Sequence, residues 1–304
     1  MKITNHKNLP SQLQRALESE YTYRPKRYSV TSLLNPLRQT MLTRRYHDEI
    51  TMDVKDGIWM LFGQGIHKAI ESVQYSSYEK VEQRLEMPIG EYTLSGIVDY
   101  INTKDEFILD WKTTSTYAYK FRDKPGSSVE HYVMQLRMYA LLWFYHSGQW
   151  ISKGKLALLL KDYKENPYPS ADDPDGPVQV LEFDLGDYES IKAWVEERFQ
   201  QIDEYESEPD FVLPLCTKEE RWNDGDKYAV MAKGKKRAVR VYDNEEDAIN
   251  HVSQAFADGE KLEVETRPGV DRRCLKYCSA APFCSHWIKN YKEATDAEST
   301  IDGL

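Results

Sequence analysis

The sequence predicts a mixed α/β fold in which a central sheet is flanked by helices. Three observations support this prediction. Apolar residues recur at helical spacing in residues 54–73, 129–146 and 188–205. Apolar or alternating segments of strand length occupy residues 78–89, 91–101, 106–112, 155–161 and 178–183. The order of helix, three strands, helix and strand is typical of a mixed sheet with helices on its faces.

Turn-forming and helix-breaking residues separate these elements. A short helix is expected within the first twenty residues. Another is expected at residues 29–45, interrupted or started near Pro36, because proline cannot donate the hydrogen bond that a helix interior needs. The composition of residues 102–105 predicts a turn, and that of residues 171–177 predicts a loop.

The chain changes character after Cys216. Strands at residues 228–231 and 237–242 are expected to form a hairpin, followed by a helix at residues 244–256 and a strand at residues 261–266. The predicted organisation is a core with N-terminal helices at residues 1–215, an inserted hairpin–helix–strand module at residues 217–273, a cysteine-bearing segment at residues 274–292 and a disordered tail at residues 293–304.

Composition and charge narrow the class of protein. The 304 residues are 40% hydrophobic and 30% charged, which is typical of a soluble enzyme. The formal net charge of −10 argues against a histone-like coat for DNA, although an acidic enzyme can gather positive charge in one cleft. No apolar segment approaches the about 20 residues of a membrane span, and the N-terminus lacks the apolar stretch of a signal peptide. A cytoplasmic protein without membrane association is therefore expected.

Two carboxylates and a lysine form the central motif. Asp99 ends the segment Gly-Ile-Val-Asp, and Asp110 and Lys112 follow the turn in Ile-Leu-Asp-Trp-Lys. Alternation along a strand places Asp110 and Lys112 on one face, and strand pairing can bring Asp99 alongside them. Converging carboxylates are unfavourable without a cation, and Mg²⁺ prefers oxygen ligands. The alternative is a surface hairpin with scattered charges, although the apolar residues before Asp110 favour a buried strand.

Two further pairs of residues lie four positions apart on predicted helices. His67 and Glu71 share one helical face, where His67 is either a further metal ligand or a core histidine. Gln135 and Tyr139 share a face of a later helix, where they are either site residues or polar positions on a mostly apolar helix. Together with the central motif, these pairs form an ordered series of residues that could bind a metal or line an active site.

That order is similar to a known family. Gly-x₃-His-x₃-Glu, Gly-x-Val-Asp, Asp-x-Lys and Gln-x₃-Tyr, in this succession, resemble the RecB-like branch of the PD-(D/E)xK nucleases, including CRISPR-associated RecB-like exonucleases and AddB-type nuclease domains. The resemblance covers about residues 29–162 and the cysteine-bearing end. Residues 228–248 also look like a segment of phage-encoded members.

The resemblance implies a restriction-endonuclease-like core and a metal-dependent DNA exonuclease that uses Mg²⁺ or Mn²⁺. Single-stranded DNA or free ends would be the substrate, in recombination or end processing, with recombination proteins as candidate partners. The alternatives are a non-catalytic DNA-binding or scaffold protein that keeps the fold, and an endonuclease of the same superfamily. The implied roles are metal binding by His67, Asp99, Asp110 and the carbonyl of Trp111, catalysis by Lys112, and shaping of the site and DNA contact by Gln135 and Tyr139.

Four cysteines form a second candidate site. Cys274, Cys278 and Cys284 lie close together in the sequence, and Cys216 lies far upstream. In a reducing compartment such a group indicates a tetrahedral Zn²⁺ or a [4Fe–4S] cluster, with buried cysteines without a ligand as the third alternative. The resemblance implies the cluster, which binds the C-terminal segment to the core in related nucleases. This chain departs from their pattern, because Cys216 must replace an upstream cysteine and the first spacer is one residue longer.

Basic residues crowd the tip of the predicted hairpin. They either form a solvated turn or follow the DNA backbone outside the active site, where each phosphate contact would add to the salt dependence of binding. The residues are Lys233, Lys235, Lys236, Arg237 and Arg240.

Overall fold

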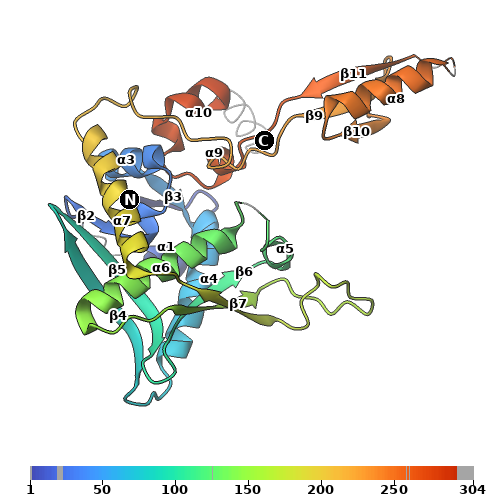
Figure 1. The fold of residues 1–304 in the computed structure, drawn as a ribbon. Coiled ribbons are helices and arrows are strands. Elements are labelled where there is room, and N and C mark those ends of the chain that lie inside the picture. Colours follow the sequence, from blue (N-terminus) through green and yellow to red (C-terminus); the bar gives the residue numbers. More distant parts are fainter. Residues whose placement is uncertain (1, 19–22, 125, 258, 260, 293–304) are drawn as a thin grey trace. The chain divides into compact units, whose positions relative to one another are not determined.

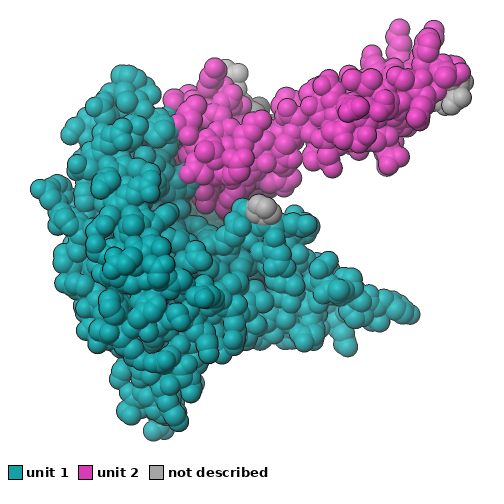
Figure 2. Space-filling model, viewed as in Figure 1, with its two compact units in different colours: residues 1–214 teal, residues 215–304 magenta. Residues whose placement is uncertain are grey.

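Two compact units make up the structure, a computed structural model that describes residues 2–18, 23–124, 126–257, 259 and 261–292. They are Met1–Pro214 and Leu215–Leu304 (Figure 2). The predicted tail at residues 293–304 lies outside the described residues. No helix in the part of the chain that the structure describes is long and apolar enough to cross a membrane.

A six-stranded mixed sheet forms the centre of the first unit (Figure 1). Its strands are β2 (Arg27–Ser29), β4 (Glu79–Ile89), β5 (Tyr92–Asn102), β6 (Phe107–Thr114), β7 (Lys153–Leu160) and β8 (Val178–Asp184). β5 pairs with antiparallel β4 along its length, with parallel β2 at residues 93–95, and with antiparallel β6 only at residues 100–102. β6 is parallel to β7, which is antiparallel to β8. The predicted mixed sheet is confirmed.

The long helix α6 (Ser128–Ser147) makes the crossover that the parallel strands β6 and β7 require. The hydroxyl of Ser127 caps its first turn by accepting from Glu130 N–H, and Gly148 ends it in the left-handed conformation at φ 72°. α6 packs across β4, β5, β6 and β7, and α7 (Tyr188–Tyr205) packs on α6. The sheet is therefore flanked by helices, as predicted.

The remaining elements of the first unit surround this core. They are β1 (Lys2–Thr4), α1 (Ser11–Leu17), α2 (Val30–Leu33), α3 (Leu37–Arg45), β3 (Thr51–Asp53), α4 (Val54–Glu71) and α5 (Thr116–Lys120). The helix predicted at residues 29–45 is broken, because α2 ends before Pro36 and α3 begins directly after it. The short parallel pair of β1 and β3 was not predicted, since three-residue strands carry no periodic signal.

The second unit contains a three-stranded antiparallel sheet with one helix packed on it. β9 (Lys227–Ala232) is the central strand between β10 (Arg240–Tyr242) and β11 (Leu262–Arg267), and α8 (Glu245–Ala257) packs on all three. β10 is shorter than the predicted strand, because turns and bends occupy most of residues 233–238. The last elements within the described residues of this unit are α9 (Arg272–Lys276), the 3₁₀ helix η1 (Ala281–Phe283) and α10 (Ser285–Asn290).

Candidate active site

β5 and β6 separate at the two acidic residues of the central motif. Their pairing ends at Tyr100 and Leu109, and Asp99 and Asp110 are the next residues along each strand. Beyond this fork the N–H of Trp111 donates over 2.9 Å to Oδ2 of Asp99 rather than to the backbone of β5. Asp99 is 9% exposed and Asp110 is 1% exposed. The fork therefore holds two buried carboxylates.

Lys112 places a positive charge beside one of these carboxylates. Its Nζ lies 2.5 Å from Oδ2 of Asp110 and 5.1 Å from the centre of the Tyr132 ring. Burial alone would lower the pKa of Lys112, but the charges of Asp110 and Asp99 outweigh it and raise that pKa above its ordinary value. Lys112 therefore stays protonated inside the site.

The carboxyl group of Asp99 is strongly perturbed. Burial raises its pKa to about 7, and the negative charge of Asp110 adds to the shift. The N–H of Trp111 and the side chains of His67 and Lys112 act in the opposite direction. The negative charge of Asp110 thus destabilises the charged form of Asp99, and a divalent cation between the two carboxylates would relieve this repulsion.

His67 reaches the fork from α4. This helix begins at Val54 because the carboxylate of Asp53 accepts a hydrogen bond from the Lys55 N–H. Nε2 of His67 lies 3.2 Å from the Trp111 carbonyl oxygen, and Nδ1 lies 3.7 Å from Oδ1 of Asp99. One ring nitrogen of His67 thus faces the Trp111 carbonyl and the other faces the carboxylate of Asp99, so the imidazole lies among oxygen atoms that could share a divalent cation with it.

Glu82 is a residue of this site that the sequence interpretation missed. It lies on β4 opposite Asp99, because the residues of β4 before and after it pair with β5 in a single continuous register. Its φ of 48° is in the left-handed region, which costs roughly 1–2 kcal/mol for a residue with a side chain. Its carboxylate lies 3.9 Å from Nδ1 of His67, and ligand atoms of His67, Glu82 and Asp99 all lie within 4.8 Å of one another. Only the strand register could have identified it.

Gln135 and Tyr139 reach the same site from α6. Nε2 of Gln135 lies within hydrogen-bonding distance of Oδ1 of Asp110, at 3.3 Å, and of the Tyr139 hydroxyl, at 2.7 Å. A Cβ at Gly96 would lie only 2.8 Å from the Tyr139 ring, so this glycine lets α6 approach β5 closely. Glu71, four residues after His67, forms an ion pair with Lys68 over 2.6 Å.

The four cysteines all belong to the second unit. Burial raises the pKa of the Cys274 thiol to about 12, and Asp271 and the other three cysteines add to this shift. Burial also raises the pKa of Cys278. The other three cysteines are therefore near enough to Cys274 to affect its thiol, although Cys216 is far from the others in sequence.

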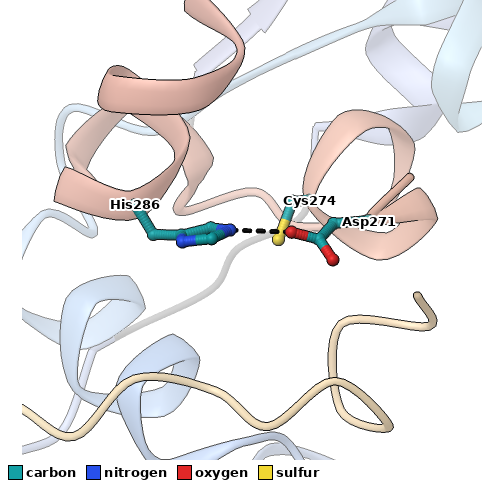
Figure 3. A group of neighbouring side chains, drawn as sticks. All are labelled: Asp271, Cys274 and His286. Atoms are coloured by element: carbon teal, nitrogen blue, oxygen red, sulfur yellow. Dashed lines mark hydrogen bonds and ion pairs between the residues drawn. The ribbon is translucent and has the colours of Figure 1, made fainter. Parts of the chain in front are cut away.

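Asp271 and His286 lie beside Cys274, which the sequence interpretation did not anticipate (Figure 3). Ligand atoms of the three residues all lie within 4.8 Å of one another. Nε2 of His286 lies 2.7 Å from Oδ2 of Asp271, Asn223 donates to the other oxygen over 2.7 Å, and Nε of Arg221 lies 3.1 Å from Oδ2. Burial opposes ionisation of Asp271, but these partners outweigh it and hold its pKa at about 2.

The basic residues of the hairpin are exposed. Lys233, Lys235, Lys236 and Arg237 lie between β9 and β10, and Arg240 begins β10. Gly234 adopts a positive φ of 76° in the turn. The guanidinium of Arg240 lies 5.0 Å from the centre of the Tyr242 ring. The positive charges thus lie on the surface of the second unit.

Residues 8–285 match the family model of the PD-(D/E)XK nuclease superfamily. The chain belongs to this superfamily. Among solved structures, this nuclease is similar to SSO0001, with 19% identity and a TM-score of 0.39, over 62% of this chain and 82% of that one. It is also similar to a phage related exonuclease from Haemophilus somnus 129PT, with 10% identity and a TM-score of 0.28, over 56% of this chain and 74% of that one. No curated protein matches the chain.

Proposed function

We propose that this nuclease is a divalent-metal-dependent DNA exonuclease whose active site is the fork between β5 and β6. The observation that carries the proposal is the buried group of Asp99, Asp110 and Lys112, with Nζ of the lysine 2.5 Å from Oδ2 of Asp110. A scaffold protein that only kept the fold would have no physical need for two buried carboxylates beside a lysine. The order of motifs around this group supports a RecB-like enzyme.

The donor set fits Mg²⁺ or Mn²⁺. The proposed ligands are Asp99, Asp110, His67 and the Trp111 carbonyl, and the position of Glu82 adds a further carboxylate. When bound, the metal supplies an activated water and stabilises charge on the phosphoryl group. An imidazole ligand is softer than oxygen, so Mn²⁺ should support the reaction at least as well as Mg²⁺.

The protein groups around the metal ligands have separate roles in this proposal. Lys112 holds a positive charge where negative charge develops on the phosphate or the attacking water. Gln135 orients the carboxylate of Asp110 and the hydroxyl of Tyr139, so that α6 fixes one side of the site. These residues thus orient the groups around the proposed metal ligands and hold a positive charge beside them.

A cleavage assay tests the proposal. Linear single-stranded DNA should be shortened progressively from its ends in the presence of Mn²⁺ or Mg²⁺, and the reaction should stop when a chelator is added. A circular single strand of the same sequence is the matched control, because an exonuclease has no end at which to start. Cleavage of the circle would identify an endonuclease. DNA binding without cleavage of any substrate would favour the non-catalytic alternative.

We also propose that the cysteines of the second unit hold a [4Fe–4S] cluster, with zinc as the alternative. Four thiolates suit either group. Asp271 and the other three cysteines disfavour the thiolate form of Cys274, and a bound metal group would offset this unfavourable charge because its cysteine ligands are deprotonated. Asp271 fits a supporting role, because its hydrogen bonds connect residues 221–223 with His286 beside Cys274.

The exposed basic hairpin is proposed to contact DNA phosphates outside the active site. Replacing Lys235, Lys236 and Arg237 together by alanine should weaken DNA binding and flatten its salt dependence, because fewer counterions are released on binding. Hydrolysis at saturating substrate should change little, since these residues belong to the second unit and the proposed catalytic residues to the first. A triple variant with the wild-type salt slope would show that the hairpin is only a solvated turn.

A further inference from the structure

Exposed aromatic side chains lie on α4, the helix that carries His67. Trp59 is 60% exposed and Phe62 is 49% exposed, and their rings meet edge to face with centroids 6.1 Å apart. Large exposed aromatic residues that lie together are uncommon on soluble proteins and mark surfaces that bind a partner. Neither residue has a role in the proposed chemistry.

The course of α4 aligns these aromatics with the fork. His67 meets the carbonyl of Trp111, and a Cβ at Gly63, one turn earlier, would lie 3.9 Å from Oγ1 of Thr113. A further turn back, the ring of Trp59 lies beneath the side-chain ammonium of Lys161. The backbone N–H of Lys161 donates to the carbonyl of Thr114, the last residue of β6, over 2.9 Å. α4 therefore runs along β6, and a rise of 1.5 Å per residue places Trp59 about 12 Å from His67.

A second aromatic pair lies at the same end of the sheet. Tyr117 on α5 and Phe121, which follows the last residue of this helix, are 67% and 42% exposed, with ring centroids 4.3 Å apart. Only Ser115 separates β6 from α5, and the Thr116 N–H donates to the carboxylate of Asp162 over 2.6 Å. Asp162 is the neighbour of Lys161, whose side chain covers Trp59. The residues that follow β7 therefore contact both the aromatic pair on α4 and the segment that carries the second aromatic pair.

The positive charge beside Trp59 and the aromatic character of the exposed side chains indicate the chemistry of the binding partner. Nζ of Lys161 lies 4.0 Å from the centre of the Trp59 ring, so a cation covers one face of an indole that is still 60% exposed. Unpaired nucleotides present base faces that stack on aromatic rings and phosphates that attract lysine. A partner helix would equally accept aliphatic side chains, whereas all four members of these two pairs are aromatic.

We propose that Trp59, Phe62, Tyr117 and Phe121 form a stacking surface for unpaired bases of a single-stranded nucleic acid near the fork. This inference rests on the proposed nuclease function and specifies its substrate as a strand with unstacked bases. The surface would hold nucleotides a short distance from the phosphate to be cleaved. Base pairing and stacking within a duplex would leave no base faces available to these rings.

Binding of a fluorescently labelled single-stranded oligodeoxynucleotide, measured by anisotropy in chelator so that no cleavage occurs, tests the inference. Trp59→Leu and Tyr117→Leu should each raise Kd roughly tenfold, equivalent to about 1.4 kcal/mol and within the range for one base–aromatic stack. Trp59→Phe should retain most of the affinity, because a ring is kept. Tyr145→Leu is the matched control. Tyr145 is also an exposed aromatic residue, at 49%, but it lies near the C-terminal end of α6 and belongs to neither aromatic pair.

Several outcomes would overturn the inference. Unchanged affinity in both leucine variants, with wild-type melting temperatures, would show that bases do not stack here. A wild-type dimer in sedimentation that Trp59→Leu converts to monomer would make this surface a protein interface. Hydrolysis with Mn²⁺ is assayed separately, so the two proposals can fail independently. Cleavage with unaffected binding contradicts only the stacking surface, whereas aromatic-dependent binding without cleavage contradicts only the nuclease proposal.

Discussion

Asp110→Asn and Lys112→Met should each reduce DNA hydrolysis by at least about 10²-fold, the loss typical when a transition-state charge loses its stabiliser. Asparagine keeps the shape that Gln135 contacts but removes the negative charge of a proposed metal ligand. Methionine keeps the length of the lysine stem and removes its positive charge. Each change leaves the partner's charge unpaired, because Asp110 and Lys112 form a buried pair, but it is preferable to alanine because truncation would also leave a cavity.

The two variants should differ in metal binding. Mn²⁺ affinity, followed by electron paramagnetic resonance without DNA, should fall in Asp110→Asn and should persist in Lys112→Met. The control is Lys155→Met, because Lys155 pairs with Glu182 over 2.7 Å on the adjacent strands β7 and β8. This control should keep both activity and metal affinity. Wild-type turnover in either active-site variant, confirmed as folded by thermal unfolding, would refute the assignment of the fork as the active site.

Cys278→Ala should remove the metal group from the second unit entirely. Protein purified without oxygen should be brown, with about four iron and four sulfide per chain for the proposed cluster type. The variant should be colourless, since losing one thiolate ligand disrupts the cluster. Hydrogen exchange should then rise in residues 271–291 of the second unit, while the sheet of the first unit keeps its protection.

The His286→Ala variant distinguishes the proposed cluster from a second kind of metal site. Cys274, Asp271 and His286 could together hold a single zinc ion with mixed ligands, without Cys278. If the cysteines hold the cluster, His286→Ala stays brown and Cys278→Ala does not. A colourless wild type with about one zinc, lost in His286→Ala and kept in Cys278→Ala, would identify the mixed site. Zinc that is lost in Cys278→Ala and kept in His286→Ala would identify the four-cysteine alternative.

Local patterns in the sequence determined most of the first unit. Apolar periodicity identified α4, α6 and α7, and alternation identified β4, β5 and β6, because each pattern repeats within a few residues. The break at Pro36 followed from its missing N–H. The motif residues Asp99, Asp110 and Lys112 were recognised for the same reason, since their strands adjoin one turn and their spacing is short.

Only the tertiary structure decided which distant residues meet. Glu82 reaches Asp99 because β4 and β5 pair in one register, and nothing within β4 distinguishes this glutamate from the others. Asp271, Asn223 and His286 likewise meet through hydrogen bonds between segments far apart in the chain. A sequence pattern reports the face on which a side chain lies, because that depends on its neighbours along the chain. Strand register and long-range contacts depend on the packing of the whole unit, and so they set the composition of both sites.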